Sequence, residues 1–531
     1  MPPLIHPPLT TLRCTKLGTN FFQKRTLSIK LRYGPHGKVS LHGSDEFTVS
    51  NPANGESLCK VVSVSKEFVD EAIDNAHNTF HSGVWSRTPA IHRSKILAKL
   101  ARLLEERVPE LARLETLQTG RTIREMNAQL GRLPEWLDYF AALLRTYQGF
   151  VAPTQGSLLN YVQRVPLGVV AQITPFNHPL LIAVKKIAPA LAAGNSVVVK
   201  PSELAPITVM ELAEMVEAAG VPPGVLTVLP GLGPTVGKAI VSHPYVRKID
   251  ASNQTGRAVG QAAGANVASF TAELGGKAPI VIFDDADIQS AVNGVAFASF
   301  VASGQTCVSG TRIIVQDNVY DKFLHALVKK TESIRQRMGD PMNPHSTMGP
   351  VISMHHLERI ERMVNGTTGN VLYGGQRMSG LSPLDGFDYA RGSFFSPTIV
   401  GDISSSDELW KEEIFGPVIV VRRFGDVAEG VALANDCKYG LGAGIWTSNV
   451  ARAHQVAADI QTGLCWVNTH HRNDPSSPWG GMKESGIGRE NGVEAFESYS
   501  QSKSTIVNTA SLDEMRKDDW FSDSSTQRRY G

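Results

Sequence analysis

The segment GVVAQI, residues 168–173, begins an alternation of strands and helices that decides the fold. An apolar stretch with helical spacing, residues 180–193, separates it from a second strand-like run, SVVV at 196–199. A further helix over 206–219 and a strand at 225–229 continue the alternation. Continuous Val, Ile and Leu strands that alternate with helices are typical of a parallel sheet covered on both faces. The sequence therefore predicts a doubly wound α/β unit.

A second alternation runs from residue 278 to about residue 479. Its strands include APIVIF at 278–283, RIIV at 312–315 and VIVV at 418–421. Each run is apolar throughout, as expected of strands buried on both faces. We therefore expect a second α/β domain.

Segments outside the two alternations complete the chain. Residues 86–106 have apolar positions at helical spacing and predict a helix. Residues 161–165, YVQRV, alternate in polarity and predict an extended arm between domains, and residues 498–508 are again β-like. The tail, residues 511–531, is charged and rich in Ser, so we expect it to be mobile.

The composition is that of an ordinary soluble globular protein. The chain has 531 residues, of which 42% are hydrophobic and 19% charged. At about 150 residues per domain, this length suggests two to four domains. Lys and Arg (52) nearly balance Asp and Glu (50), for a net charge of +2, so nothing points to nucleic acid or an acidic membrane as a partner. No apolar run reaches about 18 residues, so no transmembrane span is expected. The expected partner is a small molecule.

The cysteines and the N-terminus bear on the compartment. The cysteines, Cys14, Cys59, Cys307, Cys437 and Cys465, form no CxxC pair, which suits a reducing compartment and argues against a metal site. Residues 1–44 contain no Asp or Glu but seven Lys or Arg, a composition that resembles a mitochondrial transit peptide. Four prolines among the first eight residues favour a disordered basic extension instead. We therefore expect the protein in the cytoplasm or the mitochondrial matrix.

The strongest local signal is FVASGQTC, residues 300–307, which leads through VSGTR, residues 308–312, into a strand. A cysteine in a small, polar loop at the end of an element can present a thiolate to a substrate. A lone cysteine is more often a small buried hydrophobic residue, so this interpretation needs support from elsewhere in the chain.

The segment TAELGGK, residues 271–277, provides that support. A carboxylate before a tight Gly-Gly turn can project into a cleft, and Glu273 can then act as general base toward water or a thiol. A glutamate on its own is by default a solvated surface residue. The apolar Leu274 and the buried-strand pattern after Pro279 favour a domain junction instead.

Together these two segments resemble the active-site signatures of the aldehyde dehydrogenase superfamily, a Glu-Leu-Gly-Gly-Lys segment followed about thirty residues later by Gly-Gln-x-Cys. The resemblance spans roughly Thr48 to Asn508. It includes four further motifs in family order: TPFN (174–177), KPSE (200–203), EIFGP (413–417) and WGGMKESG (479–486). Ordered motifs at family-like spacing are highly specific.

The resemblance implies an α/β fold with a Rossmann-type NAD-binding domain, an α/β catalytic domain and a small β oligomerisation arm. The implied division is a basic extension at 1–44, the NAD-binding domain at 45–147 and 167–275, the arm at 148–166 and 491–509, the catalytic domain at 276–490 and a mobile tail at 510–531. The implied assembly is a homodimer or a homotetramer.

The resemblance also implies roles for five catalytic residues. Cys307 attacks the aldehyde carbon, and the Asn177 amide and the Cys307 backbone N–H bind the resulting oxyanion. Hydride transfer to a nicotinamide leaves a thioester, which water activated by Glu273 hydrolyses to the carboxylic acid. Lys186 and Glu490 resemble a proton-release pair, although a surface ion pair explains them equally well. Family members that pass the acyl group to coenzyme A typically lack the glutamate, so its presence favours hydrolysis.

The expected cofactor is NAD, with NADP as the alternative. Lys200 and Glu203 follow a predicted strand at its carboxyl end, where open sheets bind ligands. By resemblance they contact the adenosine ribose, and a carboxylate there repels a 2′-phosphate. Glu413 and Phe415 match positions that hold the nicotinamide ribose and ring. The full set of expected cofactor contacts is Thr174, Pro175, Phe176, Lys200, Glu203, Gly233, Thr255, Gly256, Leu274, Glu413 and Phe415.

The sequence departs from the family pattern in two places. After Asp250 the family usually continues with Phe-Thr-Gly-Ser or Phe-Thr-Gly-Gly into a helix that faces the pyrophosphate. Here residues 251–257 read ASNQTGR, with one glycine, so the alternative hypothesis is a catalytically impaired member with a truncated pyrophosphate loop. His178 follows Asn177, and Lys185 stands where many relatives carry a bulky aromatic that lines the substrate tunnel. A cation there would attract a substrate carboxylate, but lysine is seldom buried and we expect it to point to solvent.

Overall fold

The computed structural model describes residues 32–33, 37–38, 45–251, 256–519 and 521. Most of the N-terminal extension, with its predicted transit peptide, lies outside these ranges. So do residues 252–255 of the shortened loop, Thr255 included.

A six-stranded sheet forms the core of the first half of the molecule. Its order is β21-β11-β10-β7-β8-β9, in which β21 runs antiparallel at one edge and the other strands are parallel. Its strands are β7 (Val169–Ile173), β8 (Ser196–Lys200), β9 (Leu226–Val228), β10 (Val246–Ala251), β11 (Ser269–Glu273) and β21 (Gly486–Ile487). Side chains alternate between two hydrophobic clusters: Val170 and Val199 pack on one face, Ala171 and Val198 on the other.

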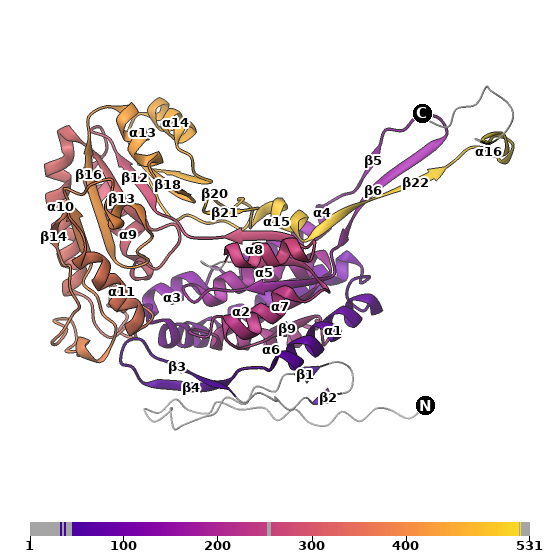
Figure 1. Ribbon diagram of the computed structural model, residues 1–531, viewed down its shortest axis with the longest axis horizontal. Coiled ribbons are helices and arrows are strands. Elements are labelled where there is room, and N and C mark those ends of the chain that lie inside the picture. Colours follow the sequence, from indigo (N-terminus) through magenta and orange to yellow (C-terminus); the bar gives the residue numbers. More distant parts are fainter. Residues whose placement is uncertain (1–31, 34–36, 39–44, 252–255, 520, 522–531) are drawn as a thin grey trace.

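Helices cover both faces of this sheet (Figure 1). The first face carries α2 (Ala90–Thr119), α3 (Ile123–Leu130), α4 (Pro134–Thr146), α5 (Pro179–Ala193) and α6 (Ile207–Ala219). The second carries α1 (Lys66–Ser82), the π-helical turn η1 (Gly233–Gly237), α7 (Lys238–Ser242) and α8 (Gly256–Ala265). The predicted doubly wound unit is confirmed.

Helix α2 is longer than the helix predicted over 86–106, because it continues past Pro109 to Thr119. A proline inside a helix removes one backbone hydrogen bond. Leu111 and Ala112 beyond it are nevertheless fully buried in the hydrophobic cluster of this face. Tertiary packing therefore outweighs the helix-breaking tendency of the proline.

A seven-stranded sheet forms the core of the second half, in the order β14-β15-β16-β13-β12-β18-β19. The strands are β12 (Ala278–Ile282), β13 (Gly310–Gln316), β14 (Asn370–Tyr373), β15 (Thr398–Gly401), β16 (Val418–Phe424), β18 (Gly442–Trp446) and β19 (Leu464–Val467). Helices α9 (Ile288–Phe300) and α10 (Asp317–Gln336) cover one face. The other is covered by α11 (Met354–Asn365), α12 (Glu408–Lys411), α13 (Val427–Asn435) and α14 (Val450–Asp459). The second α/β alternation is confirmed.

A three-stranded antiparallel sheet projects from the body as an arm (Figure 1). It consists of β5 (Phe150–Ala152), β6 (Leu158–Pro166) and β22 (Ser500–Asn508), and β22 pairs with β6 along its whole length. Short helix α16 (Leu512–Lys517) lies beyond β22 in the tail, where Ser511 and Glu514 form a capping box at its start.

The remaining described elements are short. They are β1 (Arg32–Tyr33), β2 (Gly37–Lys38), β3 (Glu46–Ser50), β4 (Ser57–Val62), the 3₁₀ turns η2 (Val301–Gly304) and η3 (Tyr389–Arg391), β17 (Tyr439–Gly440), β20 (Met482–Lys483) and α15 (Gly492–Ser498). None of the described helices combines the length and apolar composition that crossing a membrane requires.

Candidate active site

The loop that carries Cys307 joins α9 to β13 through the turn η2. Ala302 and Ser303 both have a φ of 54° and Gly304 a φ of 72°, so three consecutive residues are left-handed. Such backbone costs of order 1–3 kcal/mol for a non-glycine residue, and it persists only where the surroundings impose it. Here the Ser303 hydroxyl donates to the carbonyl of Gly349 at 2.8 Å. Left-handed non-glycine residues cluster at active sites, which agrees with the predicted role of this loop.

The Cys307 side chain is partly exposed and packs against a small apolar cluster. The cluster consists of Val308, Leu441, Trp466 and Trp479. Burial raises the pKa of the Cys307 thiol to about 12, and the Glu273 carboxyl is the next largest cause. At neutral pH the sulfur is therefore a thiol, and it must pass its proton to a base in order to act as a nucleophile.

Glu273 is the last residue of β11, where the antiparallel partner β21 holds the strand end. Its side chain is buried, and among the described residues neither carboxyl oxygen has a hydrogen-bond partner. A Cβ added to Gly480 would lie 2.9 Å from Glu273 Oε1, so the carboxyl group lies directly beside that glycine. Burial raises the pKa of Glu273 well above its usual value, and Glu490 raises it further. A carboxyl group with a raised pKa is a stronger proton acceptor than an ordinary carboxylate.

The structure brings Glu273, Cys307 and Asn177 together. A Cβ on Gly276, three residues after Glu273, would collide with the carbonyl oxygen of Cys307. The Asn177 amide donates to the carbonyl of Gln305, two residues before Cys307, at 2.9 Å. An amide nitrogen carries two hydrogens, so the second remains for an oxyanion.

Lys186 and Glu490 are buried in the molecule, and the alternative of a surface ion pair is wrong. The Lys186 ammonium contacts the carboxylates of both Glu490 and Asp250. Burial raises the pKa of Glu490, but the charges of Lys186 and Lys185 outweigh burial and lower this pKa to about 2. Sequence reasoning missed Asp250, which lies in strand β10 beside two other charged residues, Arg247 and Lys248, so no apolar run marked it as buried.

Lys185 does not point to solvent as expected. It is 2% exposed, and its Nζ lies 3.0 Å from Glu490 Oε2 and 4.7 Å from the centre of the Trp479 ring. The reason is that nearly all of α5 is buried, so this turn of the helix has no solvent-facing side. A buried ammonium needs an anionic partner, and Glu490 supplies it. The cation is therefore already neutralised and not free to attract a substrate carboxylate.

His178, the other departure from the family pattern, is buried beside Arg121. Arg121 Nη1 lies 2.6 Å from His178 Nδ1, and because a guanidinium only donates, Nδ1 accepts. Burial, followed by the charge of Arg121, lowers the pKa of His178 well below its usual value. The ring is therefore neutral with its proton on Nε2, which has no partner within the described residues.

The residues predicted to hold the adenosine ribose meet at the end of β8. Lys200 is buried, and its Nζ lies 3.2 Å from Glu203 Oε2. A Cβ on Gly237 would lie 3.4 Å from Lys200 Cδ, so the turn η1, which begins at the predicted Gly233, packs closely on this lysine.

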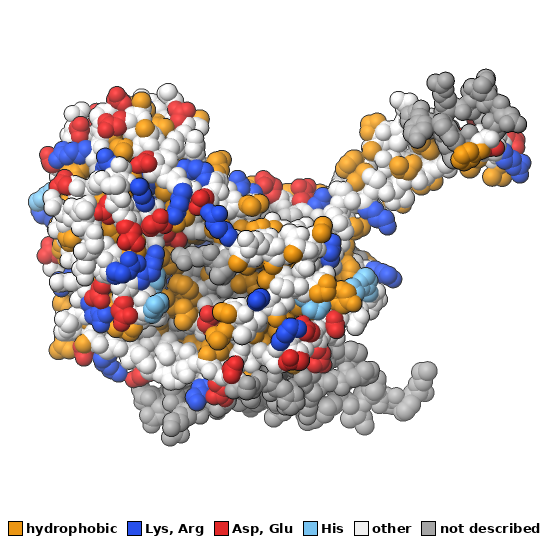
Figure 2. All heavy atoms as spheres, viewed as in Figure 1, with side chains coloured by type: hydrophobic (Ala, Val, Ile, Leu, Met, Phe, Trp, Pro, Cys, Tyr) orange, Lys and Arg blue, Asp and Glu red, His pale blue; other side chains and the backbone are white. Residues whose placement is uncertain are grey.

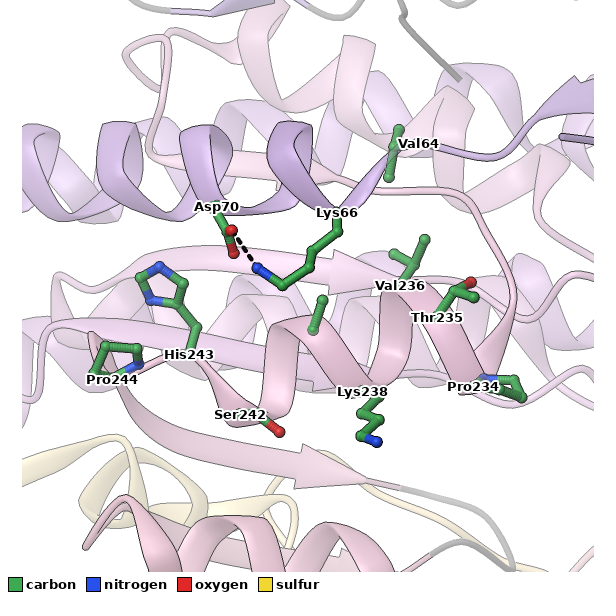
Figure 3. Close-up of a pocket in the computed structure, with 11 residues that line it drawn as sticks. Val64, Lys66, Asp70, Pro234, Thr235, Val236, Lys238, Ser242, His243 and Pro244 are labelled. Carbon is green, nitrogen blue, oxygen red and sulfur yellow. Dashed lines mark hydrogen bonds and ion pairs between the residues drawn. The ribbon is translucent and has the colours of Figure 1, made fainter. Parts of the chain in front are cut away.

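The opposite side of η1 is open. A cavity of about 700 Å³ lies between α1 and the segment η1–α7 (Figure 3). Pro234 and Val236 line it, together with Lys66 and Asp70 of α1, whose charged atoms are 2.6 Å apart. The turn η1 therefore packs on Lys200 and also borders a cavity beside α1.

Glu413 and Leu274 line a second cavity, of about 340 Å³. Glu413 accepts a hydrogen bond from the backbone N–H of Gly276 at 2.9 Å, and burial raises its pKa to about 7. Leu274 packs against Gly256, where a Cβ would collide with the leucine. Two of the predicted cofactor contacts thus line one cavity, and Gly256, the first residue of α8, supports it.

The remaining predicted contacts lie at the end of β7. The backbone N–H of Thr174 donates to the carbonyl of Lys200 at 3.0 Å, and its hydroxyl is buried with no partner in the described ranges. After Pro175, the rings of Phe176 and Phe415 meet edge to face with centroids 5.7 Å apart. The structure thus connects the strand end with the Glu413 segment.

Comparisons with known proteins show which proteins this chain resembles. Residues 40–505 match the model of the aldehyde dehydrogenase family. The chain is 39% identical over 489 residues to phenylacetaldehyde dehydrogenase of Pseudomonas fluorescens, which covers 88% of this chain and 94% of that protein. It is 36% identical to the structure of betaine aldehyde dehydrogenase from Staphylococcus aureus in complex with NAD⁺, with a TM-score of 0.87 and coverage of 91% and 95%. A third similar structure is indole-3-acetaldehyde dehydrogenase of P. syringae in complex with NAD⁺, at 33% identity, a TM-score of 0.85 and coverage of 89% and 95%.

Proposed function

The chain belongs to the aldehyde dehydrogenase family, and from that premise we propose that Cys307, Glu273 and Asn177 carry its reaction. The protein is an oxidoreductase that oxidises aldehydes to carboxylic acids with NAD. The observation that supports the assignment of these residues is their convergence. The Glu273 turn packs on the backbone of Cys307, and the Asn177 amide binds the same loop.

In the first half of the reaction, the Cys307 sulfur bonds to the aldehyde carbon. The carbonyl oxygen becomes an oxyanion, which the free N–H of the Asn177 amide and the Cys307 backbone N–H stabilise. Because the thiol has a raised pKa, its proton must leave during attack, and Glu273 is the neighbouring carboxyl group that can take it. NAD, when bound, accepts the hydride that leaves this carbon. A thioester on Cys307 results.

Between the two halves, Glu273 must release the thiol proton to solvent. In the second half, water hydrolyses the thioester: Glu273 removes a proton from the water as its oxygen bonds to the thioester carbon, and the Cys307 sulfur leaves and takes that proton back from Glu273, which restores the thiol. Within the part of the chain that the structure describes, the buried oxygens of Glu273 have no competing hydrogen bond to break before they accept that proton. A glutamate at this position favours hydrolysis over transfer of the acyl group to coenzyme A.

Lys186 and Glu490 act in proton release as fixed charges beside Glu273. Glu490, with a pKa of about 2, is a poor proton acceptor at neutral pH. Both groups nevertheless act electrostatically on Glu273. Lys186 and Glu490 therefore help to set the pH at which Glu273 loses its proton.

The cofactor fits the side chains that converge at the ends of the strands. Lys200 and Glu203 would hold the adenosine ribose, and Glu413 and Phe415 the nicotinamide ribose and ring. The unpartnered hydroxyl of Thr174 is available for a hydrogen bond. The Glu203 carboxylate repels a 2′-phosphate, so we expect NAD to be used in preference to NADP.

The arm supports a homo-oligomer, a homodimer or a homotetramer. Apolar side chains are exposed along it, as Figure 2 shows. They are Phe150, Val151, Leu158, Leu159, Ile506 and Val507. They are three pairs of consecutive strand residues, whose side chains point to opposite faces, so apolar groups are exposed on both faces of the arm, as is typical of surfaces that contact other subunits. The basic segment 1–44 supports the cytoplasm or the mitochondrial matrix as the compartment.

A cysteine variant tests the proposed function. Cys307→Ala is expected to abolish NADH formation from phenylacetaldehyde, the substrate in the name of one relative, in a screen that also contains aliphatic and carboxylate-bearing aldehydes. Cys465→Ala, at an exposed cysteine, is the matched control and retains wild-type rates. NADH formation by Cys307→Ala at the wild-type rate refutes the assignment.

A further inference from the structure

Two adjacent lysines share one carboxylate in the centre of the molecule. Lys185 and Lys186 are consecutive residues of α5. The Lys185 ammonium lies 3.0 Å from Glu490 Oε2, and the Lys186 ammonium contacts Glu490 Oε1. Both oxygens of Glu490 are therefore occupied by cations.

Asp250 completes a set of four buried charges. It contacts Lys186 through Oδ1 and accepts a hydrogen bond from the Tyr499 hydroxyl at Oδ2, 2.6 Å away. Two positive side chains thus face two negative ones, and the set is neutral. Without Lys185 it would carry one net negative charge. A buried net charge acts strongly on any titratable neighbour, because little solvent screens it.

That neighbour is Glu273. Trp479 and Glu490 exchange backbone hydrogen bonds of 2.7 Å in both directions, and Lys185 lies over the Trp479 ring. The next residue, Gly480, touches the Glu273 carboxyl group. Residues 479–490 therefore contain the aromatic ring and the carboxylate that Lys185 contacts, and also the glycine that lies beside Glu273.

We propose that Lys185 is a positioning residue of the catalytic centre, which pins Glu490 and supplies the positive charge that keeps Glu273 available as a base. This inference rests on the proposed function of Glu273. Lys185 occupies the position where many relatives carry an aromatic residue. In this chain the charge balance around the base therefore depends on a cation that the family signature does not contain.

The charges around Glu273 agree with this role. Glu490 and Asp250 raise its pKa, and Lys185 and Lys186 lower it. The Glu273 carboxyl in turn raises the pKa of Cys307. Lys248 of β10 donates to the Thr271 hydroxyl, two residues before Glu273, at 2.6 Å, and burial lowers its pKa to about 8.

Removing the Lys185 charge should shift the pH dependence of hydrolysis. An opposite charge within a few ångströms lowers the pKa of a carboxyl group, so its loss raises that pKa. We expect Lys185→Met to shift the acidic limb of the pH–rate profile for hydrolysis to a pH about one unit higher. At a pH below this limb, the rate should then be about tenfold lower than that of the wild type. Lys185→Arg keeps the charge and should leave the limb within a few tenths of a unit.

The assay uses p-nitrophenyl acetate, which tests the base without the cofactor. Cys307 sulfur bonds to the acetyl carbon, p-nitrophenolate leaves, and water hydrolyses the acetyl thioester with its proton passing to Glu273. The rate after the initial burst, followed from pH 5.5 to 9.5, reports the hydrolysis. Lys329→Met, at an exposed position of α10, is the control for the loss of one positive charge.

A second variant, for which the expected pH shift has the opposite direction, keeps the inference testable if Lys185→Met does not fold. Asp250→Asn removes a negative charge from the same set and should move the limb downward. An unmoved limb in Lys185→Met or Asp250→Asn, or an equal shift in Lys185→Arg and Lys185→Met, overturns the inference while the wild type stays active. A wild type without hydrolysis dependent on Cys307 overturns the proposed function and the inference with it.

Discussion

The two ends of the candidate site are stabilised in different ways. At the catalytic end, Lys186 and Glu490 are 0% and 5% exposed at their side chains and form part of a closed set of charges. At the end where α8 begins, Arg257 and Glu484 form a 3.0 Å ion pair, with side chains that are 79% and 47% exposed. Solvent weakens the second pair, whereas the first acts at nearly full strength on its neighbours. We therefore expect charge to determine the reaction rate at the catalytic end, and the shape of the backbone to determine cofactor binding at the other end.

The largest effect that tests this contrast is expected at Glu273. Glu273→Gln removes the base but keeps the volume of the side chain. Because general bases contribute about 10²- to 10⁴-fold to such rates, we expect the steady-state rate of NADH formation to fall by that factor at pH 7.5. The measurement is kcat with NAD and phenylacetaldehyde.

Glu494→Gln is the matched control, because Glu494 is an exposed glutamate on α15. It should retain the wild-type rate. A loss of less than about tenfold in Glu273→Gln would mean that another group removes the proton.

The cofactor end is expected to respond to shape. A Cβ at Gly256 would collide with Leu274, which lines the cavity that also contains Glu413. Overpacking of this kind costs about 1–3 kcal/mol. We therefore expect Gly256→Ala to weaken NAD binding by about tenfold or more, measured by calorimetric titration.

Gly264→Ala provides the control within the same helix. Nothing lies within 4 Å of a Cβ at Gly264, so this variant should bind NAD as the wild type does. Equal affinity of all three proteins would show that the contact between α8 and Leu274 does not shape the cofactor site. No measurable heat with the wild type would instead support the catalytically impaired alternative.

The sequence predicted the fold better than it predicted the contacts between side chains that lie far apart in the chain. The apolar runs at 168–173 and 278–283 predicted strands β7 and β12 because burial on both faces leaves a local signature. The burial of Lys185 was not predicted, because it depends on Glu490, 305 positions along the chain. The capping box at Ser511 and Glu514 is a local signal for the short helix α16, which the sequence analysis did not predict.

Asp250 is a second residue whose contacts could not be predicted from the sequence. The sequence shows an aspartate at this position, but its partners Lys186 and Tyr499 come from elements far away in the sequence. Spacing predicts which residues share an element. It does not predict which buried charges neutralise one another, because that depends on how the elements pack.

The smallest effect concerns stability at the catalytic end. His470 Nε2 donates to the carbonyl of Val308, next to Cys307, at 2.7 Å, and burial lowers the pKa of His470 to about 4. In the unfolded chain the pKa is about 6.5, so between these values the unfolded state binds the proton and the folded state does not. The contribution to stability is thus complete above about pH 6.5 and decreases as the pH falls toward 4, by at most about 1.4 kcal/mol per pH unit.

We expect His470→Asn to show a smaller drop in melting temperature between pH 7 and pH 5.5 than the wild type, because the variant has lost this proton-linked term. Its melting temperature at pH 7 should itself be lower, since the imidazole packs against Trp466 with ring centroids 4.6 Å apart. His345→Asn, at an exposed histidine, should keep the full wild-type drop. If His470→Asn keeps it as well, the buried imidazole is not what couples this end of the site to pH, and carboxyl groups such as Glu413, with a pKa of about 7, become the groups to examine next.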